Sequence, residues 1–397
     1  MQNRLQHRGT TRIETLQKMM TAAEIDVILI TYSRSLLYYT GTTQPSICII
    51  TPGHYHLFVI RAFESALEES RIDPDRISEG GQLPDLKPLL SQWAIQSGRM
   101  GLELDILPAL QYKRISETFP DFEPVDVSRL LLDQRKIKDQ EEIDHTRKAC
   151  HMLHQGHLRI LETLREGMTE LELSSEIEDA HRRAGHEGLY FIRQFDFFMG
   201  RGPIASGINI SKIAGKVVSV TGVGLSPSIP MGASRKPIKR GEMIVVDIPT
   251  HFKGYHGDQS RTYVLGDPPD ICRRMHDAMK EIADRLTDMM RPGIRCNTLY
   301  ERALAFSEAC GMGAYFMRLG TDSIRVPFIG HGVGIELNEP PLLGPGCRDV
   351  LEEGMVLALE LEMSAAPGRV VKLEDMLRIT SGGVEFLTIT PRELHRI

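Results

Sequence analysis

The feature that most constrains the fold is a set of ionisable residues inside otherwise apolar, strand-like segments of the last 160 residues. These segments are EMIVVDI, GYHGDQSRTYVLG, GHGVG, GMVLALELEM and VVKLEDMLRI, and the residues are Asp247, Asp258, His331, Glu360 and Glu374. Burying an unpaired carboxylate is costly, so clustered carboxylates need a shared cation or must take up protons. The pattern therefore favours strands that meet around a bound metal.

Each of these residues has a plainer interpretation when it is taken alone. Asp247 could cap a turn at the end of a strand, and Glu374 could pair with Lys372 or Arg378 at the surface. A single histidine in a glycine-rich segment, such as His331, is more often structural than a metal ligand. Only the combination of the five favours a metal site.

The chain of 397 residues is long enough for two domains. Its first part alternates a helical pattern (RIETLQKMMTAAEI), a buried-strand pattern (IDVILIT) and a hairpin pattern with a turn at Pro52-Gly53. We therefore predict an α/β domain over residues 1–134. The long helical pattern that follows LLLDQRKIKDQEEI begins the second domain, residues 135–397.

The second domain contains two similar helical segments. Asp139 is a candidate N-cap for a long helix, and Thr169 with Glu172 has the spacing of a capping box for the next one. Arg165-Glu166-Gly167 is matched 126 residues later by Arg291-Pro292-Gly293, which suggests an internal duplication, although so short a match can arise by chance. Strand patterns follow each helix pair, so this domain is expected to be α+β.

The five residues, in this order and spacing, resemble the ligands of the pita-bread metallopeptidases. That family includes aminopeptidase P, prolidase, methionine aminopeptidase and creatinase. The matching stretches are GEMIVVD, GYHGDQSRT, GHGVGIELNEPP, EGMVLALE and KLEDMLRIT, and IDVILITYSRSLLYYTG is similar to the N-terminal domain of the creatinase, prolidase and aminopeptidase P branch. The resemblance implies an α/β creatinase-type N-terminal domain followed by an α+β pita-bread catalytic domain with an internal pseudo-duplication.

The resemblance also implies a dinuclear metal site. Asp247 would bind one metal, Asp258 and Glu374 would bridge, and His331 and Glu360 would complete the other. Oxygen and nitrogen ligands suit manganese, cobalt, iron or zinc, and manganese is the family-weighted choice. The metals would activate a water and polarise the scissile carbonyl, with Glu360 shuttling the proton, so Glu360 and His331 are the expected catalytic residues.

Several positions depart from the family pattern. Asn338 stands where these peptidases usually have a second histidine, although the neighbouring Glu339 matches. Asparagine can donate a hydrogen bond but does not titrate near neutral pH. Met231 aligns with a further family histidine, and a thioether cannot replace imidazole as a donor. These changes leave the prolyl specificity of the family open.

Two more departures lie on the last strands. Lys372 replaces the usual arginine, which keeps the charge but not the geometry, and Glu362 stands on the strand face of Glu360 where the family often has glycine. His256 shares strand parity with Asp258 and is the better candidate for replacing a missing histidine. The default interpretation of His256 is a solvated loop residue.

The composition of the chain limits the kinds of molecule that it can bind and the compartment in which it works. The net charge is −6 and the basic residues are scattered, which excludes the basic stripe of a nucleic-acid-binding protein. The polar start of the chain and the lack of long apolar runs argue against secretion and membrane insertion, so we expect a cytoplasmic protein. The six cysteines are widely spaced, which favours reduced thiols. The resemblance adds the expectation of a homodimer.

Three functions are compatible with these observations. The first is metal-dependent hydrolysis of Xaa-Pro dipeptides or of N-terminal Xaa-Pro bonds. The second is a hydrolase or lyase reaction on a small non-peptide metabolite that uses the same metals. The missing histidines favour this function. The third is a non-catalytic binding module, which the complete ligand set disfavours because such modules typically lose ligands.

Overall fold

The computed structural model describes residues 2–197, 201–319 and 324–397, and the chain divides into two compact units, residues 1–135 and 136–397. The first unit is built on a mixed six-stranded sheet with the strand order β4-β3-β2-β1-β5-β6. Its strands are β1 (Val27–Ile30), β2 (Ser46–Ile50), β3 (Tyr55–Val59), β4 (Ile77–Glu79), β5 (Gly98–Leu102) and β6 (Phe122–Asp126). Its helices are α1 (Gln2–Ala22), α2 (Ser33–Thr40), α3 (Phe63–Glu69), α4 (Leu86–Gln92), α5 (Ala109–Thr118) and α6 (Ser128–Arg135).

The predicted hairpin of this unit is confirmed. Strands β2 and β3 pair antiparallel, with Ile50 opposite Tyr55, and the turn between them contains Pro52-Gly53. The side chains of Ile47, Ile49 and Phe58 pack with α4 and α5 in a core of their own. The α/β character expected for this unit follows from that arrangement.

The second unit contains two pairs of helices, as predicted. The first pair is α7 (Gln140–Thr163) and α8 (Glu170–Arg183), and the second is α9 (Asp270–Met289) and α10 (Cys296–Ala309). Asp139 caps α7 in a capping box with Glu142, and Thr169 does the same for α8 with Glu172.

Corresponding glycines turn the chain between the helices of each pair. Gly167 has φ 82° and Gly293 has φ 93°, a left-handed conformation that glycine adopts without a steric penalty. The two turns are therefore equivalent in conformation as well as in sequence, as expected for a duplicated unit.

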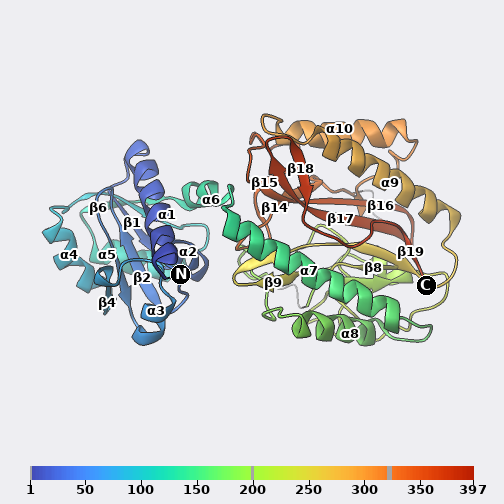
Figure 1. Ribbon diagram of the computed structural model, residues 1–397, viewed down its shortest axis with the longest axis horizontal. Helices are drawn as coiled ribbons and strands as arrows, with labels where there is room; N and C mark the ends of the chain where they lie inside the picture. The colour runs from blue at the N-terminus through green and yellow to red at the C-terminus, as the bar shows by residue number, and fades with distance from the viewer. Residues whose placement is uncertain (1, 198–200, 320–323) are drawn as a thin grey trace. The chain divides into compact units, whose positions relative to one another are not determined.

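Two main sheets lie between the helix pairs (Figure 1). One has the order β19-β11-β8-β7, from β7 (Ile204–Ser206), β8 (Met243–Val246), β11 (Arg261–Val264) and β19 (His395–Arg396). The other has the order β15-β14-β16-β17-β18, from β14 (Gly330–Gly332), β15 (Glu339–Leu342), β16 (Val356–Ala366), β17 (Arg369–Thr380) and β18 (Gly383–Phe386). Two short antiparallel pairs also lie in the unit: β9 (Thr250–Phe252) with β10 (Tyr255–Gly257), and β12 (Arg318–Leu319) with β13 (Ile324–Arg325).

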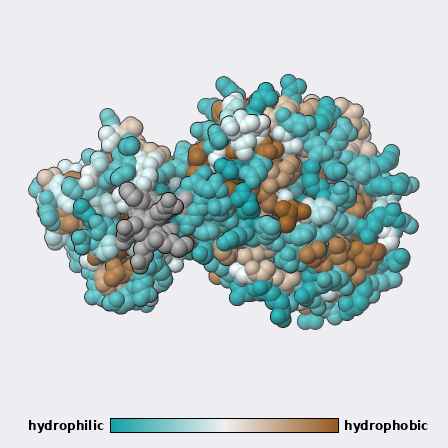
Figure 2. Space-filling view, in the orientation of Figure 1, coloured by the Kyte–Doolittle hydropathy of each residue, from teal (hydrophilic) through white to brown (hydrophobic). Residues whose placement is uncertain are grey.

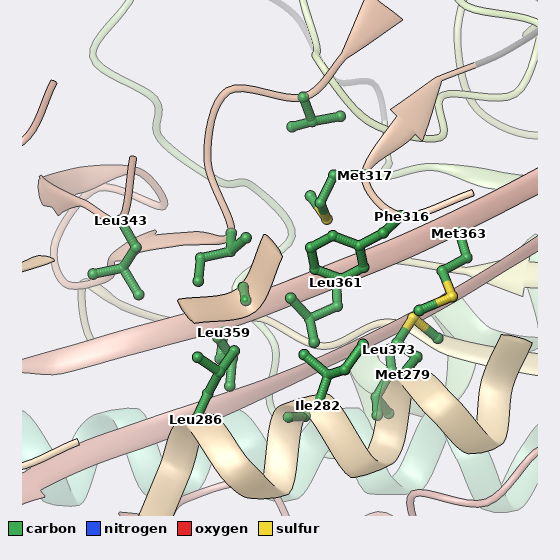
Figure 3. Packing of buried hydrophobic residues seen from close by; sticks show 14 of the residues in the cluster. Met279, Ile282, Leu286, Phe316, Met317, Leu343, Leu359, Leu361, Met363 and Leu373 are labelled. Atoms are coloured by element: carbon green, nitrogen blue, oxygen red, sulfur yellow. The ribbon is translucent and has the colours of Figure 1, made fainter. Parts of the chain in front are cut away.

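Packing of α9 on the five-stranded sheet decides which face carries polar groups. Met279, Ile282 and Leu286 of α9 lie against Leu359, Leu361 and Leu373 of β16 and β17 (Figure 3). Because neighbouring side chains on a strand point to opposite faces, the even-numbered residues of β16 and β17 face away from α9. Each buried leucine contributes about 1.5–3 kcal/mol, so this packing fixes the orientation of the polar face.

The exposed surface is mainly polar. Figure 2 shows hydrophilic residues over most of the visible face of each unit, interrupted by separate apolar patches. Among the described residues, none of the helices is both long enough and apolar enough to cross a membrane.

Candidate metal centre

Five strands or strand ends bring the predicted ligands together in the second unit. Asp247 follows β8, Asp258 follows β10, His331 lies in β14, Glu360 in β16 and Glu374 in β17, and all five are buried. Their donor atoms form two sets: one of Asp258, His331 and Glu374, and one of Asp247, Glu360 and Glu374. Within each set the atoms lie within 4.8 Å of one another, as ligands of a common cation would.

Strand register places the two glutamates side by side. Glu360 is the cross-strand partner of Glu374, and β14 pairs with the other edge of β16, which brings His331 opposite Ala358. Ser260 joins this sheet to the loop after β10. Its carbonyl accepts the Glu374 N–H at 3.2 Å, and its hydroxyl donates to Glu374 Oε2 at 2.7 Å.

His331 has the tautomer and environment of a metal ligand. Its Nδ1 lies 3.1 Å from the Gly332 carbonyl, so Nδ1 carries the proton that this hydrogen bond requires. Nε2 is left with a lone pair, 3.7 Å from Asp258 Oδ2. Burial lowers the pKa of His331, which favours the neutral ring. A lone pair that faces a carboxylate in this way is stabilised by a cation placed between them.

The carboxylates of the same set are also short of positive charge. Burial raises the pKa of Asp258 well above its usual range, and the charges of Asp247 and Glu360 raise it further. Burial likewise raises the pKa of Glu374, with Asp258 as the largest neighbouring charge. Oxygen and nitrogen donors with this repulsion among them fit a divalent metal.

The other donor set already contains a positive charge. Lys372 Nζ lies 2.5 Å from Asp247 Oδ2, 2.6 Å from Glu360 Oε1 and 3.8 Å from Glu374 Oε2. Burial opposes the ammonium form, but Asp247 and Glu360 raise the pKa of Lys372 well above its usual range. Burial also acts to raise the pKa of Glu360, yet Lys372 and then His331 hold it below its usual value. Lys372 is thus in direct contact with the predicted ligands.

Glu362 lies beside this contact. It is the cross-strand partner of Lys372 and is only 1% exposed. Its Oε2 accepts a hydrogen bond from the Ser219 hydroxyl at 3.2 Å, whereas its Oε1 has no hydrogen-bond partner among the described residues. Burial raises the pKa of Glu362 to about 8.

A cavity of about 310 Å³ opens onto the cluster. Its wall combines the ligands with apolar side chains and a few polar ones, including Gln194, Lys216, Val217, Val218, Phe328, Leu337 and Asn338. A larger and more open hollow of about 700 Å³ is lined by residues 211–214 and 223–227 with Pro230, among which only Lys212 is charged. The smaller cavity contains the chemically active groups, so it is the candidate substrate site.

The other residues that were predicted to lie beside the substrate are found in three separate places. Asn338 is exposed at the candidate cavity. Met231 is buried and lines a neighbouring hollow that includes Leu171 and Ile229. Glu339 accepts the Glu336 N–H at 3.0 Å and lies 3.4 Å from Lys138 Nζ, contacts that hold the β15 segment.

The interpretation of His256 as a solvated loop residue was wrong. The side chain is fully buried, because β9 and β10 form a hairpin beneath α7. Its Nε2 accepts the Phe191 N–H at 3.0 Å, and its Nδ1 donates to the Gly334 carbonyl at 3.0 Å. Both nitrogens bind backbone, so His256 ties two loops together and is not placed to replace a missing histidine.

Sequence reasoning missed several residues of the site. Ser260 could have been suspected from the sequence, since it lies two positions after Asp258, and residues two apart face the same side of an extended segment. Lys216, Val217 and Val218 lie in a long irregular segment between β7 and β8, where no periodicity indicates which side chains face the cavity.

Comparisons with known proteins agree with the fold. The sequence profile of metallopeptidase family M24 matches residues 144–381, and that of the creatinase/prolidase N-terminal domain matches residues 12–137. An Xaa-Pro dipeptidase of Pyrococcus furiosus is 26% identical over 389 residues, which cover 96% of this chain and 99% of that protein.

Solved structures show the same likeness. The Xaa-Pro dipeptidase from Bacillus anthracis has a TM-score of 0.80 at 25% identity, covering 98% of this chain and 100% of that one. The prolidase from Pyrococcus horikoshii has a TM-score of 0.78 at 26% identity, covering 97% and 99%. The predicted two-domain fold, a creatinase-type domain followed by a pita-bread domain, is confirmed.

Proposed function

The chain belongs to metallopeptidase family M24, and from this premise we propose that it is a prolidase-like Xaa-Pro peptidase acting on small peptides. The observation that supports the proposal most is the buried set of Asp258, His331 and Glu374 at the wall of a cavity. The domain of residues 135–397 would carry catalysis, and residues 1–134 would form the N-terminal domain.

The family implies divalent metal cofactors, and we propose two per chain, with manganese as the first choice and cobalt, iron or zinc as alternatives. Asp247, Asp258, His331, Glu360 and Glu374 would hold them. When bound, the metals supply an activated water and a polarised carbonyl. The chain's own contribution is Glu360, whose carboxylate can accept a proton from water and return it to the leaving amine.

The cavity suits a small prolyl substrate. At about 310 Å³ it lies at the lower end of the roughly 300–1,000 Å³ usual for ligand sites, which favours dipeptides over long chains. Val217, Val218 and Phe328 offer an apolar wall for the pyrrolidine ring. Lys216 offers a cation for the free carboxylate of a dipeptide.

The test is a comparison of Xaa-Pro dipeptides with non-prolyl dipeptides on the chelated protein before and after Mn²⁺ is restored. We expect metal-dependent cleavage of the prolyl peptides and its loss in Asp258→Asn. Asp267→Asn is the control, because Asp267 pairs with Arg396 on the surface. Metal binding without cleavage of either peptide class would refute the peptidase proposal.

A small non-peptide metabolite is the second candidate substrate. The observation that favours it is the exposed Asn338 at the cavity, where the resemblance expects a titratable histidine. Metal binding with no peptide cleavage, followed by turnover of a non-peptide amide, would support this alternative. Homodimerisation and a cytoplasmic location stay predictions, and light scattering on the purified protein tests the first.

A further inference from the structure

An irregular segment between β7 and β8 forms one wall of the candidate cavity. Four of its residues, Lys216, Val217, Val218 and Ser219, line the cavity, and residues 215–220 are called the wall segment below. In the described part of the chain, no hydrogen bond between backbone groups joins the wall segment to other residues. Its position beside the cavity therefore depends on contacts of side chains.

The longer loop that contains the wall segment is fixed at its two ends. Glu170, at the start of α8, is fully buried and accepts hydrogen bonds from Ser206 and Asn209 before the loop and from Ser234 after it. These contacts hold the chain where it enters and leaves the loop. They do not reach the middle of the loop, where the cavity wall lies.

Glu362 holds the middle of this loop to the five-stranded sheet. Its side chain projects from β16 and is buried, and its Oε2 accepts a hydrogen bond from the Ser219 hydroxyl at 3.2 Å. The N–H of the next residue, Val220, faces the same carboxylate. Ser219 and Val220 are both buried, whereas Val218 just before them is exposed. The wall segment is thus joined at Glu362 to the strand that carries Glu360.

The outer part of the wall segment has a weaker contact. Lys216 Nζ donates to the Phe195 carbonyl at 2.8 Å, and both residues are exposed. A hydrogen bond in the low-dielectric interior is stronger than one at the surface, where water competes for the same groups. Lys216 is also the cation proposed for the substrate carboxylate, and binding that carboxylate would draw it away from Phe195. The contact with Glu362 does not depend on the substrate.

We propose that Glu362 is a positioning residue for the substrate, because it fixes the distance between the wall segment and the predicted metal ligands. It lies behind the cavity wall and acts through Ser219. Glycine, which the family often has at this position, has no side chain that could make the contact. A wall held close to the ligands keeps the cavity small and favours dipeptides over longer peptides. The inference rests on the proposed function for its substrate.

Hydrogen exchange of the metal-free, full-length protein, read by mass spectrometry, tests the contact without a substrate. In Glu362→Ala the amides of residues 216–220 should exchange about tenfold faster, because a buried hydrogen bond to a carboxylate is lost. Ser219→Ala should also speed this exchange, and the double variant should add little to either single one. Glu362→Gln keeps an acceptor oxygen and should exchange like the wild type. Glu385→Ala is the control, because this glutamate of the same sheet pairs with Arg147 instead.

Steady-state kinetics of the Mn²⁺-loaded proteins give the second readout. Glu362→Ala should raise KM for an Xaa-Pro dipeptide about tenfold with kcat nearly unchanged, and should reduce the preference for the dipeptide over the corresponding tripeptide. Glu362→Gln should restore the KM of the wild type. The metal content of all variants, counted by elemental analysis, should be equal, which separates a displaced wall from a damaged metal site.

Each readout can overturn the inference. Unchanged exchange of the wall segment in Glu362→Ala contradicts the proposed contact, and Ser219→Ala decides the question in the same way if Glu362→Ala does not fold. Faster exchange with an unchanged KM contradicts the role in positioning the substrate. If the wild type cleaves no peptide, the proposed function fails, whereas faster exchange in the variants still supports the contact between Glu362 and the wall segment.

Discussion

Acidification should destabilise the second unit through His181, a buried histidine of α8. The side chain is 2% exposed and lies against α7, and burial lowers its pKa to about 3, helped by His186, whose ring centroid is 6.3 Å away. Between about pH 6.5 and about pH 3, the imidazole is therefore protonated in the unfolded chain but neutral in the folded chain. The stability is fully present above the unfolded pKa and is lost progressively as the pH falls.

The size of the effect follows from the same values. At about pH 5, one and a half units below the unfolded pKa, His181 should remove about 2 kcal/mol of stability relative to about pH 7.5. His181→Gln does not titrate and should escape this loss, whatever its effect at neutral pH. The variant should therefore gain about 2 kcal/mol on the wild type between the two pH values.

Urea unfolding of the metal-free proteins, followed by far-ultraviolet circular dichroism at both pH values, measures this difference. EDTA in all samples keeps metal loss at low pH from contributing. His151→Gln, at an exposed α7 position, is the control for replacing a histidine by glutamine. A parallel pH dependence of His181→Gln and the wild type would refute the assignment of a buried neutral imidazole.

Three further predictions concern packing, metal and substrate. A methyl group at Gly156 would lie 2.2 Å from an imidazole nitrogen of α8, so Gly156→Ala should lower the free energy of unfolding by about 1–3 kcal/mol in urea titrations. Because burial raises the carboxyl pKa values of Asp258 and Glu374, the metal-free protein should lose thermal stability as the pH rises above the ordinary carboxyl range, and saturating Mn²⁺ should abolish that slope. If the Lys216 ammonium binds the substrate carboxylate with about 1.4 kcal/mol, Lys216→Met should raise KM for dipeptides about tenfold with little change in kcat. Lys212 lies in the neighbouring hollow, so Lys212→Met should leave KM unchanged.

The parts of the fold that local physics controls could be predicted from the sequence. The capping residues Asp139 and Thr169 act on backbone groups within three residues, so their motifs are readable without tertiary information. The polar positions of β16 and β17 were equally readable, because strand alternation separates Glu360 and Glu374 from the leucines that pack on α9.

Features that depend on contacts between distant parts of the chain could not be predicted from the sequence. His256 was expected in solvent, but it is buried beneath α7 and hydrogen-bonds to backbone groups of Phe191 and Gly334, 65 and 78 positions away. The cavity wall from residues 216–218 belongs to a segment without regular periodicity. Neither residue spacing nor propensity specifies which loop covers a given strand end.

The position of Lys372 shows how a single substitution within a complete motif can change its chemistry. Sequence alignment treats lysine in place of arginine as a conserved charge, but an ammonium concentrates its charge at one point and turns on a flexible stem. Here that point lies 2.5 Å from Asp247 Oδ2 and 2.6 Å from Glu360 Oε1. The five predicted ligands are therefore all retained, while the lysine beside them gives the site a point charge in place of a planar fork of donors.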